Sequence, residues 1–210
     1  MSNVTRQGIL CVVSGPSGSG KTTLCHRFAE SDGDSVYSVS CTTRPPREGE
    51  VDGIDYHFLS NEEFEEKISA GELLEFAQVH ASGRYYGTLK QPVVEALSQG
   101  IDVLMDLDVK GAQQVRALED PMIASSLVDV FILPRSLEEL MDRVRKRGPM
   151  TQEELDLRMK NASAEMQHWQ DYHYAILSGE KEADFAEFGA ILRAERHRSS
   201  RLKLTNQEQM

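Results

Sequence analysis

A glycine-rich octet near the start of the chain lies between an apolar run and a stretch with a helical pattern. The apolar run GILCVVS covers residues 8–14, the helical pattern covers 21–30, and the octet between them reads Gly15-Pro16-Ser17-Gly18-Ser19-Gly20-Lys21-Thr22. The pattern G-x-x-x-x-G-K-[ST] between a strand and a helix is a phosphate-binding loop. Its glycines let backbone N–H groups converge on an anion, and the helix N-terminus adds a positive dipole. The sequence therefore predicts an α/β core that binds a nucleoside triphosphate, with an ordinary glycine-rich turn as the alternative.

Lys21 and Thr22 add side-chain chemistry to this loop. An ammonium group at this position reaches the β and γ phosphates, and the hydroxyl can hold Mg²⁺. Asp106 and Asp108 end the apolar run IDVLMDLD, and ligands of open α/β sheets bind at the carboxyl edge of the strands. We predict Mg²⁺ at Thr22 and Asp106; for Asp108, capping of a following helix is the alternative. The residues expected to bind the triphosphate are Gly15, Pro16, Ser17, Gly18, Ser19, Gly20, Lys21, Thr22 and Thr23.

Composition limits the kind of protein that carries this loop. The 210 residues suit one α/β core with small insertions. Hydrophobic residues make up 40% of the chain, no apolar run reaches membrane-spanning length, and the opening MSNVTRQG lacks the apolar segment of a signal peptide. Cys11, Cys25 and Cys41 have no metal-binding spacing, which favours reduced thiols. We expect a soluble cytoplasmic protein with no membrane partner.

The formal net charge of −11 argues against a general nucleic-acid-binding protein and makes clustered arginines informative. Arg44 and Arg47 flank two prolines, which hold the backbone extended. Guanidinium groups bind phosphate bidentately, and the hydroxyls of Tyr56 and Tyr86 in the same region could donate to the same oxygens. We predict a second anion site here; the alternative is a proline-rich surface loop with solvated arginines.

A further cationic cluster begins at Arg143 in the segment RVRKR, which Gly148-Pro149 and then Arg158 follow. The Gly-Pro break predicts a mobile tip between two helices. Arginines on a closing lid could neutralise charge on a transferred phosphoryl group. The alternative is a solvated basic helix end in a favourable dipole.

Short apolar runs alternate with helical patterns along most of the chain, which predicts a parallel sheet flanked by helices. Two S/T-x-x-E capping boxes, at Ser136 and Thr151, indicate helix starts, and Gly100 ends another helix. The expected strands are 8–14, 35–40, 101–107, 126–134 and 174–177, and the expected helices are 21–30, 90–99, 110–118, 136–147, 152–169 and 180–197.

Residues 41–90 interrupt this alternation. They contain short β-like pieces, turns and a short helix in SNEEFEEKISA that Ser60 and Glu63 would cap. This pattern predicts a small α+β insertion between two core elements. The last ten or so residues are expected to fray.

Together these segments resemble the guanylate kinase family. The matching segments are SGPSGSGKTTL, SVSCTTRPPREGEVDGIDYHF, LLEFAQVHASGRYYGT, LMDLDVKGAQQV, FILPRSLEELMDRVRKRG, the Arg158 segment and ILRAER. The resemblance covers nearly the whole chain in order. It implies Mg²⁺-dependent conversion of ATP and GMP (or dGMP) to ADP and GDP, with these small molecules as partners and a monomer or homo-oligomer as the assembly. It also implies one P-loop NTPase core (1–40, 91–142 and 159–210), a GMP-binding insertion (41–90) and a helical lid (143–158).

The resemblance assigns a role to each matching position. The residues that would read the guanine base are Ser40, Glu75, Thr88 and Asp108, and those that would bind the GMP phosphate are Arg44, Arg47, Tyr56 and Tyr86. The lid arginines would be Arg143, Arg147 and Arg158. Lys21, Arg44 and these three lid arginines are the expected catalytic residues.

Guanine recognition by Glu75 is consistent with the chemistry of the base. Guanine offers N1–H and N2–H₂ as adjacent donors, which one carboxylate accepts together, whereas N1 of adenine is an acceptor and would leave the carboxylate unpaired. The sequence departs from the family pattern in three places. FAQVHASGR is about two residues longer than the family loop, Ser178-Gly179-Glu180 replaces a common Asn-Asp pair, and Lys110 is an unusual charge.

Two other functions are compatible with parts of this pattern. A sugar-phosphate or AMP kinase on the same scaffold would keep Lys21 and the lid arginines but would not need Ser40, Glu75 and Thr88 together. A phosphopeptide-binding module of the guanylate-kinase-like type typically has a degraded phosphate loop and flanking domains, whereas this chain has an intact octet.

Overall fold

A five-stranded parallel sheet forms the centre of the molecule in the computed structural model, which describes residues 3–79, 82–146 and 148–205. Its strands are β2 (Leu10–Ser14), β3 (Ser35–Tyr37), β8 (Asp102–Asp106), β9 (Leu127–Pro134) and β10 (Tyr174–Ser178). Their order is β10-β9-β2-β8-β3, and every neighbouring pair is parallel. The predicted fold class is confirmed. The strand that precedes the glycine-rich loop is the middle strand of the sheet.

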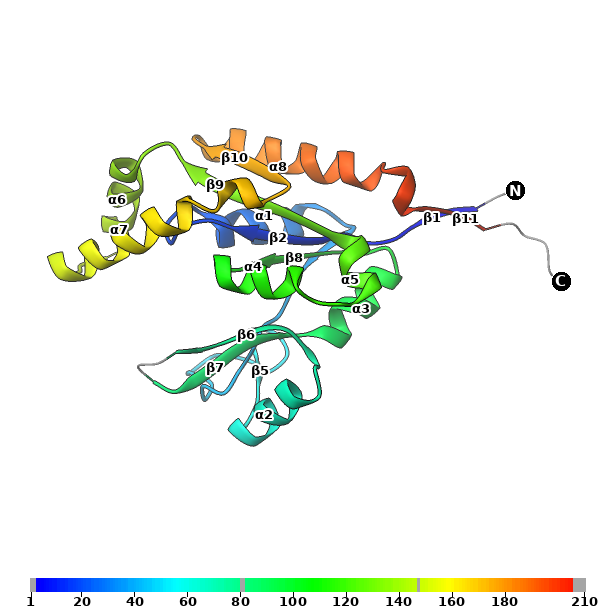
Figure 1. Cartoon of the computed structure of the whole chain (residues 1–210), viewed down its shortest axis with the longest axis horizontal. Helices are drawn as coiled ribbons and strands as arrows, with labels where there is room; N and C mark the ends of the chain where they lie inside the picture. The colour runs from blue at the N-terminus through cyan, green and yellow to red at the C-terminus, as the bar shows by residue number, and fades with distance from the viewer. Residues whose placement is uncertain (1–2, 80–81, 147, 206–210) are drawn as a thin grey trace.

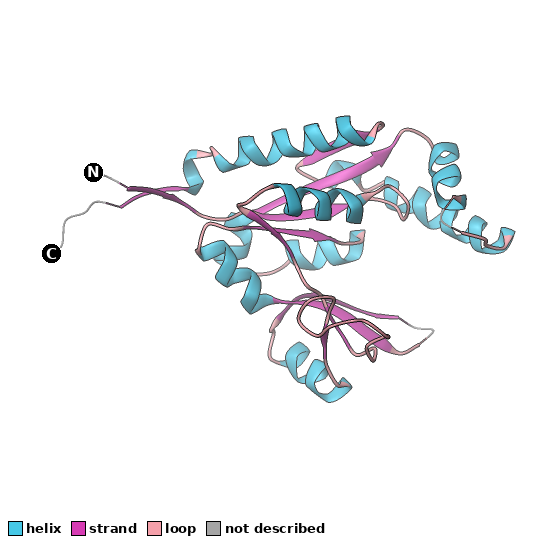
Figure 2. Cartoon of the chain, turned by 180° about the vertical axis from the view of Figure 1, so that it is seen from behind, coloured by secondary structure: helices cyan, strands magenta, loops and turns pink. Residues whose placement is uncertain are grey.

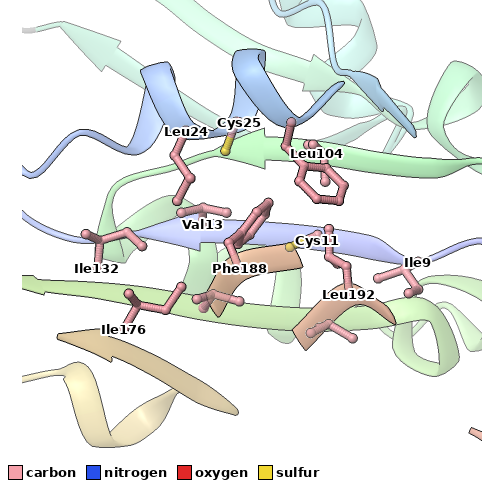
Figure 3. Packing of buried hydrophobic residues seen from close by; sticks show 13 residues of the cluster. Ile9, Cys11, Val13, Leu24, Cys25, Leu104, Ile132, Ile176, Phe188 and Leu192 are labelled. Carbon is pink, nitrogen blue, oxygen red and sulfur yellow. The ribbon is translucent and has the colours of Figure 1, made fainter. Parts of the chain in front are cut away.

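Helices cover both faces of this sheet, and alternate residues of β2 divide the core between them. Cys11 and Val13 face α1 (Lys21–Ser31) and α8 (Lys181–Arg196) (Figure 3). In this layer the rings of Phe28 and Phe188 meet edge to face. Leu10 and Val12 face the opposite layer, which consists of α3 (Lys90–Ser98), α4 (Val109–Arg116) and α5 (Pro121–Ser126). A strand covered on both faces is apolar throughout, as the run GILCVVS is.

A second sheet lies beside the first (Figure 2). Its elements are β4 (Cys41–Thr42), β5 (His57–Phe58), α2 (Asn61–Ser69), β6 (Leu73–Val79) and β7 (Arg84–Leu89). The strand order is β5-β4-β7-β6, and α2 packs on the sheet through the fully buried Phe64, which belongs to a small separate core. Ser60 and Glu63 form the expected capping box at the start of α2.

The helices α6 (Leu137–Arg145) and α7 (Gln152–Met166) pack on each other at one end of the central sheet. Thr151 forms the expected capping box. Ser136 accepts from the backbone of Glu139 as predicted, but the Glu139 carboxylate binds Arg143 one turn further along instead of returning to the cap. The expectation of a full capping box at Ser136 was therefore wrong, because the neighbouring guanidinium offers a charged partner.

The two ends of the described chain pair with each other. β1 (Asn3–Arg6) and β11 (Leu202–Thr205) form an antiparallel ribbon that projects from the body (Figure 1). Two short helical turns, η1 (Trp169–Asp171) and η2 (Ser199–Arg201), precede β10 and β11 respectively. The expectation that residues 202–205 fray was wrong, because the partner strand lies some 200 positions away in the sequence; residues 206–210 lie outside the described part. Among the described residues, no helix is long and apolar enough to cross a membrane.

Candidate active site

The glycine-rich loop connects the carboxyl end of β2 to the first turn of α1. Gly15, Gly18 and Gly20 have φ angles of 143°, 96° and 99°, which L side chains rarely adopt. A Cβ at Gly15 would lie 2.5 Å from the carbonyl oxygen of Ile132, whereas the space around Gly20 is open to at least 4 Å. The ammonium of Lys21 donates to the carbonyl oxygens of Gly15 (2.6 Å) and Pro16 (3.2 Å) and so lies across the loop.

A hydroxyl and a carboxylate meet beside this loop. Thr22 in the first turn of α1 donates to Asp106 at the end of the adjacent strand β8, with an oxygen–oxygen distance of 2.5 Å. The other oxygen of Asp106 accepts from the hydroxyl of Tyr37. Burial and the bond to Asp106 raise the pKa of Tyr37 well above its usual range, so Tyr37 stays a neutral donor. Hard oxygen donors of this kind suit Mg²⁺, and the two residues predicted to hold it are in contact.

A cavity of about 660 Å³ opens beside the loop. Gly18, Ser19 and Gly20 line it on one side, and residues from α6 and the start of α8 line the other. Its charged lining residues are Arg27, Arg143, Lys146, Lys181 and Asp184. Four cations against one carboxylate make this cavity suitable for a polyanion, although the whole chain is acidic.

Arg143 is fixed at the wall of this cavity. Its guanidinium donates to Ser178 (2.8 Å), to the carbonyl of Gly179 (3.2 Å) and to Glu139 (2.5 Å). Ser178 is fully buried and donates in turn to Asp184, which also accepts from the backbone of Gly179. The segment that departs from the family pattern is therefore hydrogen-bonded to Arg143, one of the three residues predicted as lid arginines.

Three of the four residues predicted to bind a second anion lie together, namely Arg44, Tyr56 and Tyr86, and Glu50 is an unpredicted partner. Glu50 binds both terminal nitrogens of Arg44, at 2.8 and 2.9 Å, and accepts from the backbone N–H of Arg47 at 2.7 Å. The guanidinium of Arg44 holds the pKa of Glu50 at about 2, so the pair stays ionised. Arg44 is buried and lies 5.3 Å above the ring of Tyr56, which in turn packs edge to face with Tyr86.

Three of the four predicted base-reading residues lie together. Thr88 on β7 donates to Glu75 on β6 at 2.8 Å, and both side chains are buried. Asp108 caps α4 by accepting from the backbone of Gly111 at 2.8 Å. A Cβ at Gly111 would lie 3.4 Å from Glu75 Oε2 and 3.5 Å from Asp108 Oδ1, so both carboxylates lie over the same glycine. Burial, with a smaller contribution from Asp108, raises the pKa of Glu75 to about 7.

The other predicted site residues are less tightly placed. Ser40 lies between β3 and β4, where its carbonyl oxygen accepts from the backbone of His57 at 2.9 Å. Arg47 and Arg158 are exposed, and Arg158 lies on α7. Arg147 lies outside the described residues. The sequence reasoning missed Glu50, Tyr37 and Asp184. Only Glu50 had a recognisable signal, since it follows Arg47 by three residues in RPPREGE.

The geometry agrees with comparisons to known proteins. The sequence profile of the guanylate kinase family matches residues 7–195. A guanylate kinase from Maricaulis maris is 48% identical over 191 residues, which are 91% of this chain and 85% of that protein. One from Agrobacterium fabrum is 43% identical over 198 residues, which are 94% and 87% of the two proteins.

A solved structure agrees with these sequence relatives. The crystal structure of guanylate kinase from Anaplasma phagocytophilum superposes with a TM-score of 0.72 at 31% identity, covering 95% of this chain and 92% of that one. With a phosphate loop at the middle strand of a parallel sheet and a second sheet carrying a buried carboxylate, the chain belongs to the guanylate kinase family.

Proposed function

We propose that this protein transfers the γ-phosphoryl group of ATP to GMP, producing ADP and GDP, as a cytoplasmic enzyme of purine nucleotide metabolism. The observation that carries the proposal is the combination of two sites in one chain. An intact phosphate loop lies at the end of β2, and the buried Glu75–Thr88 pair lies on the second sheet near the end of β8. Neither a degraded binding module nor an AMP-specific kinase needs both.

ATP is the co-substrate that the family implies, and the loop geometry supports its placement. The triphosphate would lie along the open side of Gly20, with Lys21 at the β and γ phosphates. Thr22 and Asp106 would hold Mg²⁺, which would supply positive charge to neutralise the phosphates. Arg143, Arg147 and Arg158 are the cations we assign to the transferred group.

The acceptor would bind to the second sheet. Arg44, Arg47, Tyr56 and Tyr86 would hold the phosphate of GMP. Glu75 would accept N1–H and N2–H of guanine, while Thr88, Asp108 and Ser40 complete the base site. An oxygen of the GMP phosphate is the nucleophile, so no side chain needs to form a covalent bond, and catalysis consists of positioning and charge neutralisation.

The domain division follows from these roles. Residues 41–90 would be the GMP-binding unit, 143–158 the lid, and 1–40, 91–142 and 159–210 the core. The second sheet with its own hydrophobic cluster supports the first boundary pair, and the packing of α6 on α7 supports the lid. Lid closure would exclude water, which could otherwise hydrolyse ATP.

The test is ADP formation from ATP and Mg²⁺ with GMP, AMP, CMP or UMP offered singly to the purified protein. Turnover with GMP alone is the expected result. Turnover with AMP instead would be consistent with the assignment of the phosphate loop and would contradict the assignment of the guanine-reading residues. ATP binding without turnover on any acceptor would favour a binding module.

Replacement of Arg44 by lysine tests the phosphate site. We expect KM for GMP to rise about tenfold with KM for ATP unchanged, because an ammonium cannot form the bidentate pair that a guanidinium forms. The matched control is Arg84→Lys at the exposed start of β7, which should leave both constants unchanged. Equal effects of the two substitutions would reject the assignment.

A further inference from the structure

The helix α4 lies against the second sheet along one of its faces. Asp108, Gly111 and Gln114 are spaced three residues apart, so they lie roughly one turn from each other on the same side of the helix. The carboxylates of Glu75 and Asp108 both lie beside Gly111, as described above. Gln114 continues this line of contacts to the next residue of β6.

Gln114 binds the backbone of Phe76 at both of its polar groups. Its side-chain oxygen accepts from the Phe76 N–H, and its side-chain nitrogen donates to the Phe76 carbonyl, each at 3.0 Å. Among the described strands, β6 is an outer strand of the sheet and pairs with β7 alone. The outward backbone groups of an edge strand have no strand to pair with. One amide side chain therefore replaces a strand at the residue that follows Glu75.

The backbone on the other side of Glu75 is irregular. Leu73 pairs with Leu89 and Glu75 pairs with Thr88, so Leu74 is an extra residue in β6. Leu73 belongs to the hydrophobic cluster of the second sheet, whereas Leu74 is buried in the cluster that contains α4. Irregularities of this kind redirect side chains and weaken the regular pairing of a ladder. The direction of Glu75 therefore depends on contacts from α4, outside its own sheet, as well as on the hydrogen bond from Thr88 within it.

We infer that Gln114 is a positioning residue for guanine recognition. Its amide holds the Phe76 backbone against α4 and thereby fixes the strand from which the carboxylate of Glu75 projects toward Thr88. Gln114 does not touch the base in this role; it sets the angle at which Glu75 meets two adjacent donors. This inference rests on the proposed function, since it assumes that Glu75 binds guanine.

The test is Gln114→Met, which keeps the length of the side chain and removes both hydrogen bonds. We expect KM for GMP to rise about tenfold, with KM for ATP and the rate at saturating GMP within about twofold of wild type, because two hydrogen bonds that align the base reader are lost. IMP lacks the 2-amino group and uses one donor fewer. The preference for GMP over IMP in kcat/KM should therefore fall as well, which a general loosening of the fold would not cause.

Two controls distinguish a positioning role of Gln114 from a general destabilisation of the fold. Gln113→Met changes the same residue type on the exposed side of α4 and should leave all constants unchanged. In a Glu75→Gln background, Gln114→Met should add less than about a twofold effect, because residues that act through one contact are not additive. If Gln114→Met does not fold, Gln114→Asn retains the amide with a shorter reach and should show the same loss of preference.

Three outcomes would overturn the inference: an unchanged KM for GMP, an equal loss for GMP and IMP, or additive effects in the double variant. Each of them can be obtained with a wild-type enzyme that phosphorylates GMP. Failure of the proposed function is a different result, in which the wild-type protein itself does not use GMP.

Discussion

Replacement of Lys21 by alanine should lower the turnover number by about a thousandfold or more, because it removes the cation expected at the transferred phosphoryl group. In the structure the ammonium lies across the loop on the carbonyl oxygens of Gly15 and Pro16. It would have to exchange these neutral partners for phosphate oxygens when ATP binds. Its contribution should therefore grow as negative charge develops on the transferred group, and kcat should fall more than affinity for ATP.

The measurement is steady-state kcat together with ATP affinity from calorimetry. Lys203→Ala, on the exposed terminal ribbon far from the loop, is the matched control and should behave like wild type. The Lys21→Ala protein should keep its thermal midpoint, because the loop conformation depends on its glycines and on the packing of α1. A variant with near wild-type kcat would reject the mechanism.

The central fold was predictable because its signals are local. The apolar run GILCVVS, followed directly by a glycine-rich turn, favours a strand buried on both faces, as in the middle of a covered parallel sheet. The caps at Ser60 and Thr151 depend on two residues three positions apart, so the sequence alone locates them. The terminal ribbon was missed for the opposite reason, because neither strand has a partner nearby in the sequence.

The candidate site likewise contains some residues that the sequence could place and others that it could not. The octet places Lys21 and Thr22 by spacing alone, and the topology of a parallel sheet brings Asp106 beside them. Glu75 could not be distinguished from an exposed strand residue without the family resemblance. Its burial arises from β7 and α4, which the sequence does not place. Gln114 on α4 binds the backbone of Phe76 on β6, a contact between elements far apart in the sequence that no periodic pattern marks.

Glu75→Gln should raise KM for GMP about a hundredfold while KM for ATP changes less than twofold, because the glutamine amide presents donors to guanine donors and leaves polar groups unpaired. The same carboxylate predicts a pH dependence. Its pKa is raised to about 7 by burial, so the ionised form that accepts both guanine N–H groups is depleted below that pH. Between pH 8 and pH 6, KM for GMP should rise by about tenfold, as expected for one proton on one group.

The phosphate of GMP also titrates near pH 6, so the wild-type profile needs a reference. Glu75→Gln supplies it, because the variant keeps the phosphate site and lacks the carboxyl group. Glu66→Gln, an equal charge change on the exposed side of α2, should retain the wild-type profile. A wild-type rise in KM that persists unchanged in Glu75→Gln would assign the titration to the substrate and reject Glu75 as the base reader.

As the pH rises from 6 to 8, the stability of the folded protein should decrease while its affinity for GMP increases. The pKa of Glu75 is raised in the folded protein above its value in the unfolded chain, so the folded state is favoured at low pH and loses that advantage as the pH rises toward about 7. Glutamine does not titrate. The stability gained by Glu75→Gln should therefore be small near pH 5 and approach about 3 kcal/mol at pH 8 in the absence of nucleotide. Thermal midpoints at the two pH values test this directly: a variant that is less stable than wild type at pH 8 would mean that the Thr88 hydrogen bond outweighs the cost of burying the charge.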